Sequence, residues 1–121
     1  AYRGVNALLM ISDYEGGPAN IPEAAAMGVP IFANPIGMVP DLIVDRQHGL
    51  YLSMDPNTDA ERLNTLAHPG NHEYLALRRH CAEPNPRIAT WEEVIDRNIR
   101  QYLHTLKASQ ALINNMLETL A

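Results

Sequence analysis

The chain has 121 residues, which is enough for one compact domain at most. Apolar residues make up 46% of it and charged residues 19%, a composition typical of a folded globular chain and unlike that of a disordered one. The formal net charge is −5, and the nine lysine and arginine residues are scattered along the sequence. A nucleic-acid surface needs clustered cations, so the composition argues against nucleic acid as a partner.

Cysteine use and hydropathy bear on the compartment. Cys81 is the single cysteine, which excludes an internal disulfide and favours a reducing compartment, with the cytoplasm as the expected location. No apolar run approaches the roughly 20 residues that span a bilayer, so we expect no transmembrane segment. The chain opens on Ala1-Tyr2-Arg3-Gly4 without an initiator methionine, and we expect it to be part of a longer protein.

The first half of the chain reads as strand, helix, strand, helix, strand. Residues 7–11 are a continuous apolar run, the pattern of a strand buried on both faces. After a glycine-rich loop, Asn20 and Glu23 predict an N-terminal capping box, and the helix that follows should stop at Gly28. Residues 29–33 predict the second strand.

A turn at residues 34–37 follows, with Gly37 expected at positive φ or at the site. A short helix is expected at residues 39–44 and the third strand at residues 50–52. Such alternation predicts a small parallel sheet of about three strands with crossover helices. Ligands of such sheets bind beyond the carboxyl ends of the strands, so the loops at residues 12–20 and 34–39 should line one edge.

The second half is predicted to be helical throughout. A helix is expected at residues 55–66, then a turn at residues 67–71, then a second helix to about Cys81, followed by an extended link at residues 83–86. From Thr90 a helix should run to the end, started by a capping box with Glu93. The sequence therefore predicts two parts, residues 1–89 with the sheet and residues 90–121 as a helical segment.

The last helix carries an apolar seam of heptad type with one polar member. Its partner is open between the sheet, a further domain, and the same helix of a second chain, so a homodimer is one expectation. The seam consists of Ile99, Leu103, Leu106, Gln110, Ile113, Leu117 and Leu120.

Two glutamates in the glycine-rich region are the candidate functional residues. Glu15 lies on the loop and Glu23 in the first turn of the helix, eight positions later. Carboxylates accept paired hydrogen bonds from vicinal hydroxyls, and a helix amino end keeps a nearby carboxylate ionised. The pair therefore predicts a small polar ligand such as a sugar nucleotide, bound by both side chains.

The surrounding residues resemble a known signature. Residues 5–52 are similar to the second half of the C-terminal, nucleotide-sugar-binding domain of retaining glycosyltransferases of family four, enzymes with two Rossmann-like domains known as the GT-B fold. Their E-x7-E element reads here as Ser12, Glu15, Gly16, Pro18, Glu23, Ala24, Ala26, Gly28 and Pro30. The later residues Gly37, Pro40-Asp41-Leu42-Ile43 and His48-Gly49-Leu50 also resemble the family, and Trp91 stands where the family often has a tryptophan.

The resemblance implies an enzyme that transfers a hexosyl group from a nucleoside-diphosphate sugar to a hydroxyl acceptor with retention, without metal or other cofactor. It implies that Glu23 binds the ribose and that Glu15 contacts the transferred sugar, as the catalytic residue of the set. It also implies that Gly16 and Gly17 allow close approach of the ligand, and that amides at Asn20 and Ile21 hold the diphosphate.

Two departures from the family limit this expectation. Gly17 stands where a bulky apolar residue is common, which predicts a looser loop. The arginine and lysine that bind the diphosphate, and the N-terminal acceptor domain, lie before this segment in the family. The resemblance therefore implies a chain that contributes half of a donor site, is inactive alone, and has the acceptor domain as a missing partner.

Plainer interpretations stay open. Glu23 could serve only to cap the helix, Glu15 could be a solvated loop charge, and Trp91 is favoured as a core residue. Asp13 and Asp41 could be helix caps or sugar contacts, and caps are favoured. The chain could also be a non-catalytic interaction module that oligomerises through its sheet edge or last helix, or a relative that has lost the activity.

Overall fold

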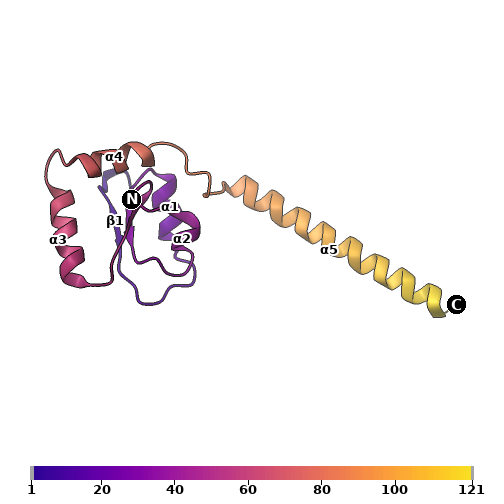
Figure 1. Cartoon of the computed structure of the whole chain (residues 1–121). Helices are drawn as coiled ribbons and strands as arrows, with labels where there is room; N and C mark the ends of the chain where they lie inside the picture. Colours follow the sequence, from indigo (N-terminus) through magenta and orange to yellow (C-terminus); the bar gives the residue numbers. More distant parts are fainter. Residues whose placement is uncertain (1, 121) are drawn as a thin grey trace. The chain divides into compact units, whose positions relative to one another are not determined.

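The computed structural model describes residues 2–120, and the side chains of residues 2–119. The chain divides into two compact units, one ending at Ile88 and the other beginning at Ala89 (Figure 1). The first unit contains a sheet and its helices, and the second contains one long helix. Each unit is described by itself.

A three-stranded parallel sheet forms the centre of the first unit. Its strands are β1 (Leu8–Met10), β2 (Ile31–Ala33) and β3 (Gly49–Tyr51), in the order β1-β2-β3. Both pairings are parallel. The predicted α/β class and the small parallel sheet are therefore confirmed.

The strand predicted to be buried on both faces is the wrong one. Residue Leu9 in β1 is 48% exposed, whereas all three residues of β2 are buried. The reason is position in the sheet, because β1 lies at an edge and β2 lies between two neighbours. Apolar continuity alone does not distinguish an edge strand from a central one.

Helices cover both faces of the sheet (Figure 1). Ile31 and Ala33 belong to a core cluster with Ile21 of α1 (Asn20–Ala26) and Val39 of α2 (Val39–Leu42). Phe32 belongs to a second cluster. Because side chains alternate across a strand, the two clusters lie on opposite faces.

The second cluster is completed by α3 (Pro56–Ala67) and α4 (His72–Cys81), which contribute Leu66 and Leu77. Both helices begin with a side-chain cap. Asp55 accepts a hydrogen bond from the Thr58 amide, and Asn71 from the Tyr74 amide. A short 3-10 helix, η1 (Tyr2–Gly4), precedes the sheet.

The stop of α1 at Gly28 is confirmed. Gly28 has φ of 67°, its amide donates to the Ala25 carbonyl, and the Val29 amide donates to the Ala24 carbonyl. These two bonds are the Schellman pattern, which requires a left-handed residue after the helix. A Cβ at Gly28 would lie 2.8 Å from the Cys81 carbonyl oxygen, so the same glycine also allows α4 to pack closely.

The second unit is helix α5 (Trp91–Leu120). Its predicted capping box is confirmed, since the Thr90 amide donates to Glu93 Oε2 at 2.7 Å and the Glu93 amide donates to Thr90 Oγ1 at 3.2 Å. Trp91 is 78% exposed and α5 by itself offers it no core, so its interpretation as a core residue stays a prediction. No helix in residues 2–120 is both long and apolar enough to cross a membrane.

Candidate functional site

Two loops meet at the carboxyl edge of the sheet, as the sequence predicts. Residues 11–19 leave β1 and residues 34–38 leave β2. The buried Asn34 side chain joins them, because its Nδ2 donates to the Ser12 carbonyl at 2.8 Å.

The backbones of the two loops are in direct contact at Gly37. This residue has φ of 53°, confirming the expected positive value, and a Cβ built on it would lie 2.1 Å from the Glu15 carbonyl oxygen. Only glycine fits so close to another backbone in this conformation. Gly37 therefore fixes where Glu15 lies.

Glu15 is half-buried on its loop, and its Oε1 accepts a hydrogen bond from Ser12 Oγ at 3.1 Å. Gly16 and Gly17, which follow it, are both exposed. A Cβ at Gly17 would meet Met38 Sδ at 3.5 Å, an ordinary contact distance. The loop therefore has room for a small side chain at position 17.

The start of α1 differs from the prediction. Asn20 is the first helical residue, while the cap position is Ala19, which has helical φ and ψ and makes no side-chain cap. The chain already turns at Pro18, whose carbonyl accepts from the Ile21 amide at 3.2 Å. The capping box of Asn20 and Glu23 is therefore wrong, because the helical turn begins before Asn20.

This start also determines what the other predicted residues do. The Ile21 amide is engaged by Pro18, and the Ile21 side chain is fully buried in the core. The Asn20 Oδ1 atom is buried and has no hydrogen-bond partner. The amide of Glu23 donates to the Ala19 carbonyl at 3.3 Å. The structure thus places Asn20 and Glu23 near the loop and assigns Ile21 to packing.

The Glu23 side chain is exposed, and its Oε2 accepts a hydrogen bond from the Tyr2 hydroxyl at 3.1 Å. Partial desolvation and this bond to a carboxylate raise the pKa of the Tyr2 phenol. The Glu23 carboxylate makes no capping hydrogen bond at the start of the helix. Its only protein partner in the described residues is a surface hydroxyl.

Glu15 and Glu23 accept from different hydroxyls, Ser12 and Tyr2, and neither carboxylate forms an ion pair within residues 2–120. One carboxylate is half-buried and the other exposed, so both are within reach of a ligand from solvent. That one ligand contacts both remains a prediction.

A cavity of about 240 Å³, which the sequence did not predict, lies at the same edge of the sheet. Asn34 lines it, is 2% exposed, and has an Oδ1 atom without a partner. Asp59 also lines it, and its Oδ1 accepts from the amide and hydroxyl of Ser53. Asn34 directly follows a predicted strand, and this position is a signal by which it could have been predicted as a site residue. The lining is Ile11, Asp13, Asn34, Met54, Pro56, Asp59, Ala60 and Leu63.

The caps proposed from sequence are not seen at two aspartates. Asp13 is exposed on the loop after β1 and lines the cavity just described. Asp41 lies within α2, a helix that begins at Val39 after Met38 without a side-chain cap. Neither residue starts a helix, so Asp13 joins Asn34 and Asp59 among the polar groups of the carboxyl edge.

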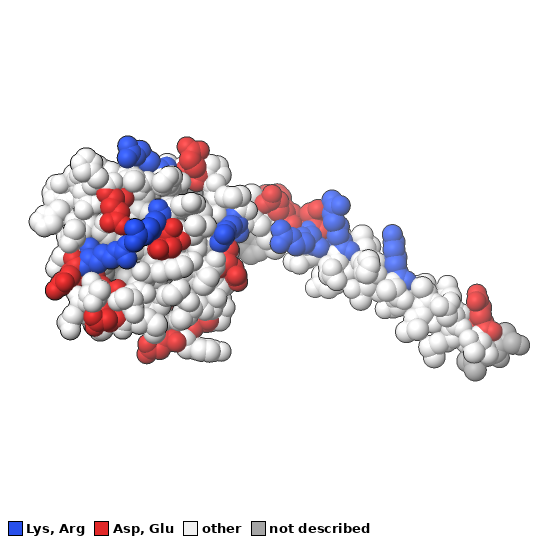
Figure 2. All heavy atoms as spheres, viewed as in Figure 1, with Lys and Arg blue, Asp and Glu red and all other residues white. Residues whose placement is uncertain are grey.

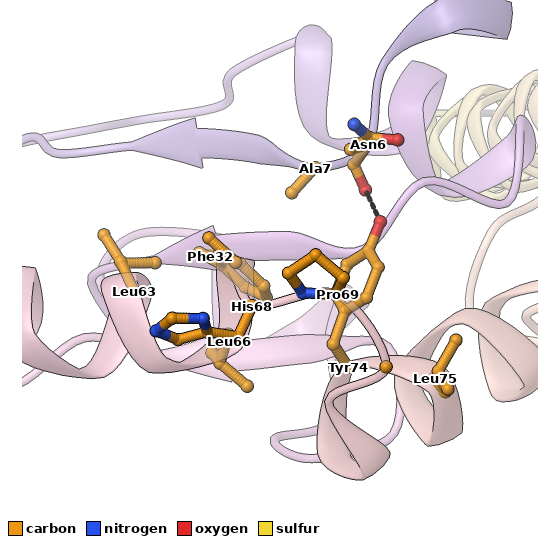
Figure 3. Close-up of a pocket in the computed structure, with 11 residues that line it drawn as sticks. Asn6, Ala7, Phe32, Leu63, Leu66, His68, Pro69, Tyr74 and Leu75 are labelled. Atoms are coloured by element: carbon orange, nitrogen blue, oxygen red, sulfur yellow. Dashed lines mark hydrogen bonds between the residues drawn. The ribbon is translucent and has the colours of Figure 1, made fainter.

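A second cavity, of about 320 Å³, lies at the amino end of β1 (Figure 3). Asn6, Ala7, Phe32 and Tyr74 are among the residues that line it, and the Tyr74 hydroxyl donates a hydrogen bond to the Asn6 carbonyl at 3.0 Å. Its lining is mostly apolar. It lies away from the carboxyl edge and from Glu15, so it is not the predicted site.

Two further observations concern the surface charge and the possible metal ligands. Blue and red side chains intermix on the face seen in Figure 2, without a basic patch on that face. Within residues 2–120 no three His, Cys, Asp or Glu side chains are grouped so as to hold a metal ion. The carboxylates of Asp13, Glu15 and Glu23 are hydrogen-bond acceptors, which suit a partner rich in hydroxyl groups.

Comparison of the chain with protein-family models, with curated proteins and with solved structures gives no match. The functional case therefore depends on the residues of the motif and on the positions that they occupy at the carboxyl edge of the sheet.

Proposed function

We propose that this chain supplies the ribose and sugar contacts of a donor site for a nucleoside-diphosphate sugar, as the second half of the C-terminal domain of a retaining GT-B glycosyltransferase. One observation supports the proposal above all. Five of the nine residues of the E-x7-E pattern, Ser12, Glu15, Gly16, Pro18 and Glu23, fall on the loop and first helical turn that follow β1, at the carboxyl edge where parallel sheets bind ligands. The other four lie along α1 and in its link to β2.

Glu23 is proposed to accept from the two ribose hydroxyls. Its carboxylate is exposed in the first turn of α1, where the helix dipole favours the charged form. Two vicinal hydroxyls present two donors at the spacing of the two carboxylate oxygens. The ribose would replace the Tyr2 hydroxyl, which now donates to Glu23 Oε2.

Glu15 is proposed to contact the hydroxyls of the transferred hexosyl group as the catalytic residue. The contact between Gly37 and the Glu15 carbonyl fixes its backbone, and such fixed placement is what a group acting in a transition state requires. Gly16 and Gly17 leave the loop open beside it.

The proposed reaction transfers the hexosyl group to a hydroxyl acceptor with retention. Stabilising the leaving diphosphate requires positive charge near the phosphates. We propose that the remaining cations and the acceptor site come from an N-terminal domain, and that the 121 residues alone bind donor without turnover.

Isothermal titration of the chain with uridine, guanosine and adenosine diphosphates and their hexose conjugates tests the proposal. We expect the nucleotides of one of the three bases to bind. Glu23→Gln should weaken that binding about tenfold or more, because a hydrogen bond to a charged group is lost. Glu61→Gln, an exposed glutamate on α3, is the matched control and should leave binding unchanged.

Glu15→Gln separates the two roles. It should weaken binding of the hexose conjugate while leaving the free diphosphate unaffected, since Glu15 is assigned to the sugar alone. Binding that survives Glu23→Gln without change would overturn the ribose assignment, and absence of binding by every nucleotide would overturn the proposal.

The alternative from a different class is a non-catalytic interaction module. Leu9 on the edge strand is 48% exposed and favours pairing of that edge with another polypeptide. A chain of this kind would keep its size unchanged when nucleotides are added, which light scattering with and without nucleotide measures, and it would give no binding heat in the same titrations.

A further inference from the structure

Helix α5 has an apolar stripe that its own unit leaves uncovered. Eight apolar side chains of this stripe are each 50% exposed or more. Beyond Arg100 the helix carries few charges, and Figure 2 shows its surface there as mostly uncharged. The stripe consists of Ile95, Ile99, Tyr102, Leu103, Leu106, Ile113, Met116 and Leu117.

The size of the stripe matches a stable protein interface. Burying one aliphatic side chain removes on the order of 100 Å² from water, so the eight residues present roughly 800 Å² per helix. Standard interfaces bury about 800 Å² per partner. At 30 residues, α5 is also long enough for three heptads.

We infer that α5 is a self-association helix, and that copies of this chain assemble through it as a parallel, in-register bundle of more than two helices. This inference is independent of the proposed glycosyltransferase function. It commits to a second copy of the chain as the occupant of the stripe.

The repeat selects the copy as partner. The alternating spacing assigns Leu103, Gln110 and Leu117 to heptad position a, and Ile99, Leu106 and Ile113 to position d. A lone polar residue at position a specifies register when it meets its own copy. Parallel in-register helices place Gln110 opposite Gln110, where the two amides can donate and accept in turn.

The charges flanking the seam agree with a parallel arrangement. In such a bundle, position g of one helix faces position e of its neighbour in the next heptad. The pairs are Ile95 with Arg100 and Tyr102 with Lys107, and neither opposes like charges. The Lys107 ammonium would meet the Tyr102 ring, a favourable cation–π contact.

The core residues favour more than two helices. Leucine at position a with isoleucine at position d shifts parallel coiled coils from dimers to trimers or tetramers. Here Leu103 and Leu117 occupy position a, and isoleucine occupies two of the three d positions, with Leu106 at the third. Apolar Ile95, Tyr102 and Met116 at position g widen the stripe, so that each helix can contact two neighbours.

Light scattering coupled to size exclusion measures the assembly directly. We expect the whole chain at micromolar concentration to show three or four times its mass of 13.4 kDa. Leu106→Glu at the centre of the seam should reduce this to the monomer. Leu112→Glu, an exposed leucine on the same helix but outside the seam, should leave the assembly intact.

Two further variants test register and orientation. Gln110→Leu should strengthen the assembly, because it removes the polar layer. Leu117→Cys should form a disulfide between copies under mild oxidation, since parallel helices bring equal positions together while Cys81 is buried.

Three results would overturn the inference. These are a monomeric or dimeric wild-type chain, an equal loss of assembly in Leu106→Glu and Leu112→Glu, and a Leu117→Cys variant that assembles but does not cross-link. Urea denaturation of the first unit verifies that both glutamate variants remain folded.

Discussion

Gly37 is the residue at which the two loops of the carboxyl edge touch. Its φ is 53°, and its α-carbon faces the Glu15 carbonyl with no space for a methyl group. Gly37→Ala should therefore lower the free energy of unfolding by about 2–4 kcal/mol, since both strain and displacement of Glu15 oppose the new side chain. Urea denaturation followed by circular dichroism measures the change.

Substitutions at two other glycines separate the cost of backbone strain from the cost of displacing Glu15. Gly70 has φ of 80° but open space around its α-carbon, so Gly70→Ala should cost only about 1 kcal/mol from strain. Gly16 has open space and no positive φ, and Gly16→Ala should change stability by less than about 0.5 kcal/mol. Equal losses in Gly37→Ala and Gly70→Ala would show that the contact with Glu15 is unimportant.

His48 makes the first unit sensitive to acid. Its Nδ1 accepts from the Val44 amide at 3.2 Å, and only an unprotonated nitrogen can do so. Burial, followed by the nearby charges of Arg87 and His80, lowers the pKa of His48. Because the folded pKa lies below the unfolded one, the neutral imidazole stabilises the fold fully above about pH 6.5.

This contribution is lost as the pH falls through the lowered pKa of His48. We therefore expect the stability advantage of the wild type over His48→Gln to shrink between neutral pH and pH about 5. Urea denaturation of both proteins at each pH gives the comparison. An advantage that stays constant or grows on acidification would contradict this assignment.

Among the elements, α5 has no core within its own unit, so until copies of the chain assemble its stability depends on its own ends. The reciprocal bonds between Thr90 and Glu93 satisfy two amides of its first turn. Thr90→Ala should cost about 1 kcal/mol and reduce the helix signal in circular dichroism. Thr105→Ala in the middle of the same helix removes a hydroxyl without removing a cap, and unchanged helix content in both variants would refute the role of the cap.

The order of strands and helices could be predicted because local signals agree with the fold. The apolar runs at residues 29–33 and 50–52, the glycine stop at Gly28 and the capping residues at Thr90 and Glu93 each report on structure within a few residues. The joining of two loops at one edge followed from the parallel order of the strands.

Features set by distant contacts could not be predicted. Leu9 belongs to an apolar run like that of β2, and only the place of β1 at the edge exposes it. Asn20 has the sequence of a cap, but the turn at Pro18 moves the helix start. The contact between Gly37 and Glu15 joins residues whose separation in sequence gives no sign of it.

For the whole molecule, the proposed site is half of a donor site held on a three-stranded parallel sheet and its helices. The carboxylates of Glu15 and Glu23 both reach solvent at the carboxyl edge, and each accepts a hydrogen bond from a neighbouring hydroxyl group. Such a surface suits the hydroxyls of ribose and hexose better than phosphate. Phosphate charge therefore has to be met by groups from outside residues 2–88 in the proposed enzyme.

The central claim is that one nucleoside-diphosphate hexose contacts both glutamates at this edge. Amide NMR spectra of the chain titrated with the nucleotide sugar that binds in calorimetry test it most directly. We predict changes in amide chemical shift that are concentrated at residues 12–23 and 34–38. Shifts confined to the cavity formed by Asn6, Phe32 and Tyr74, or no shifts at saturating ligand, would contradict it.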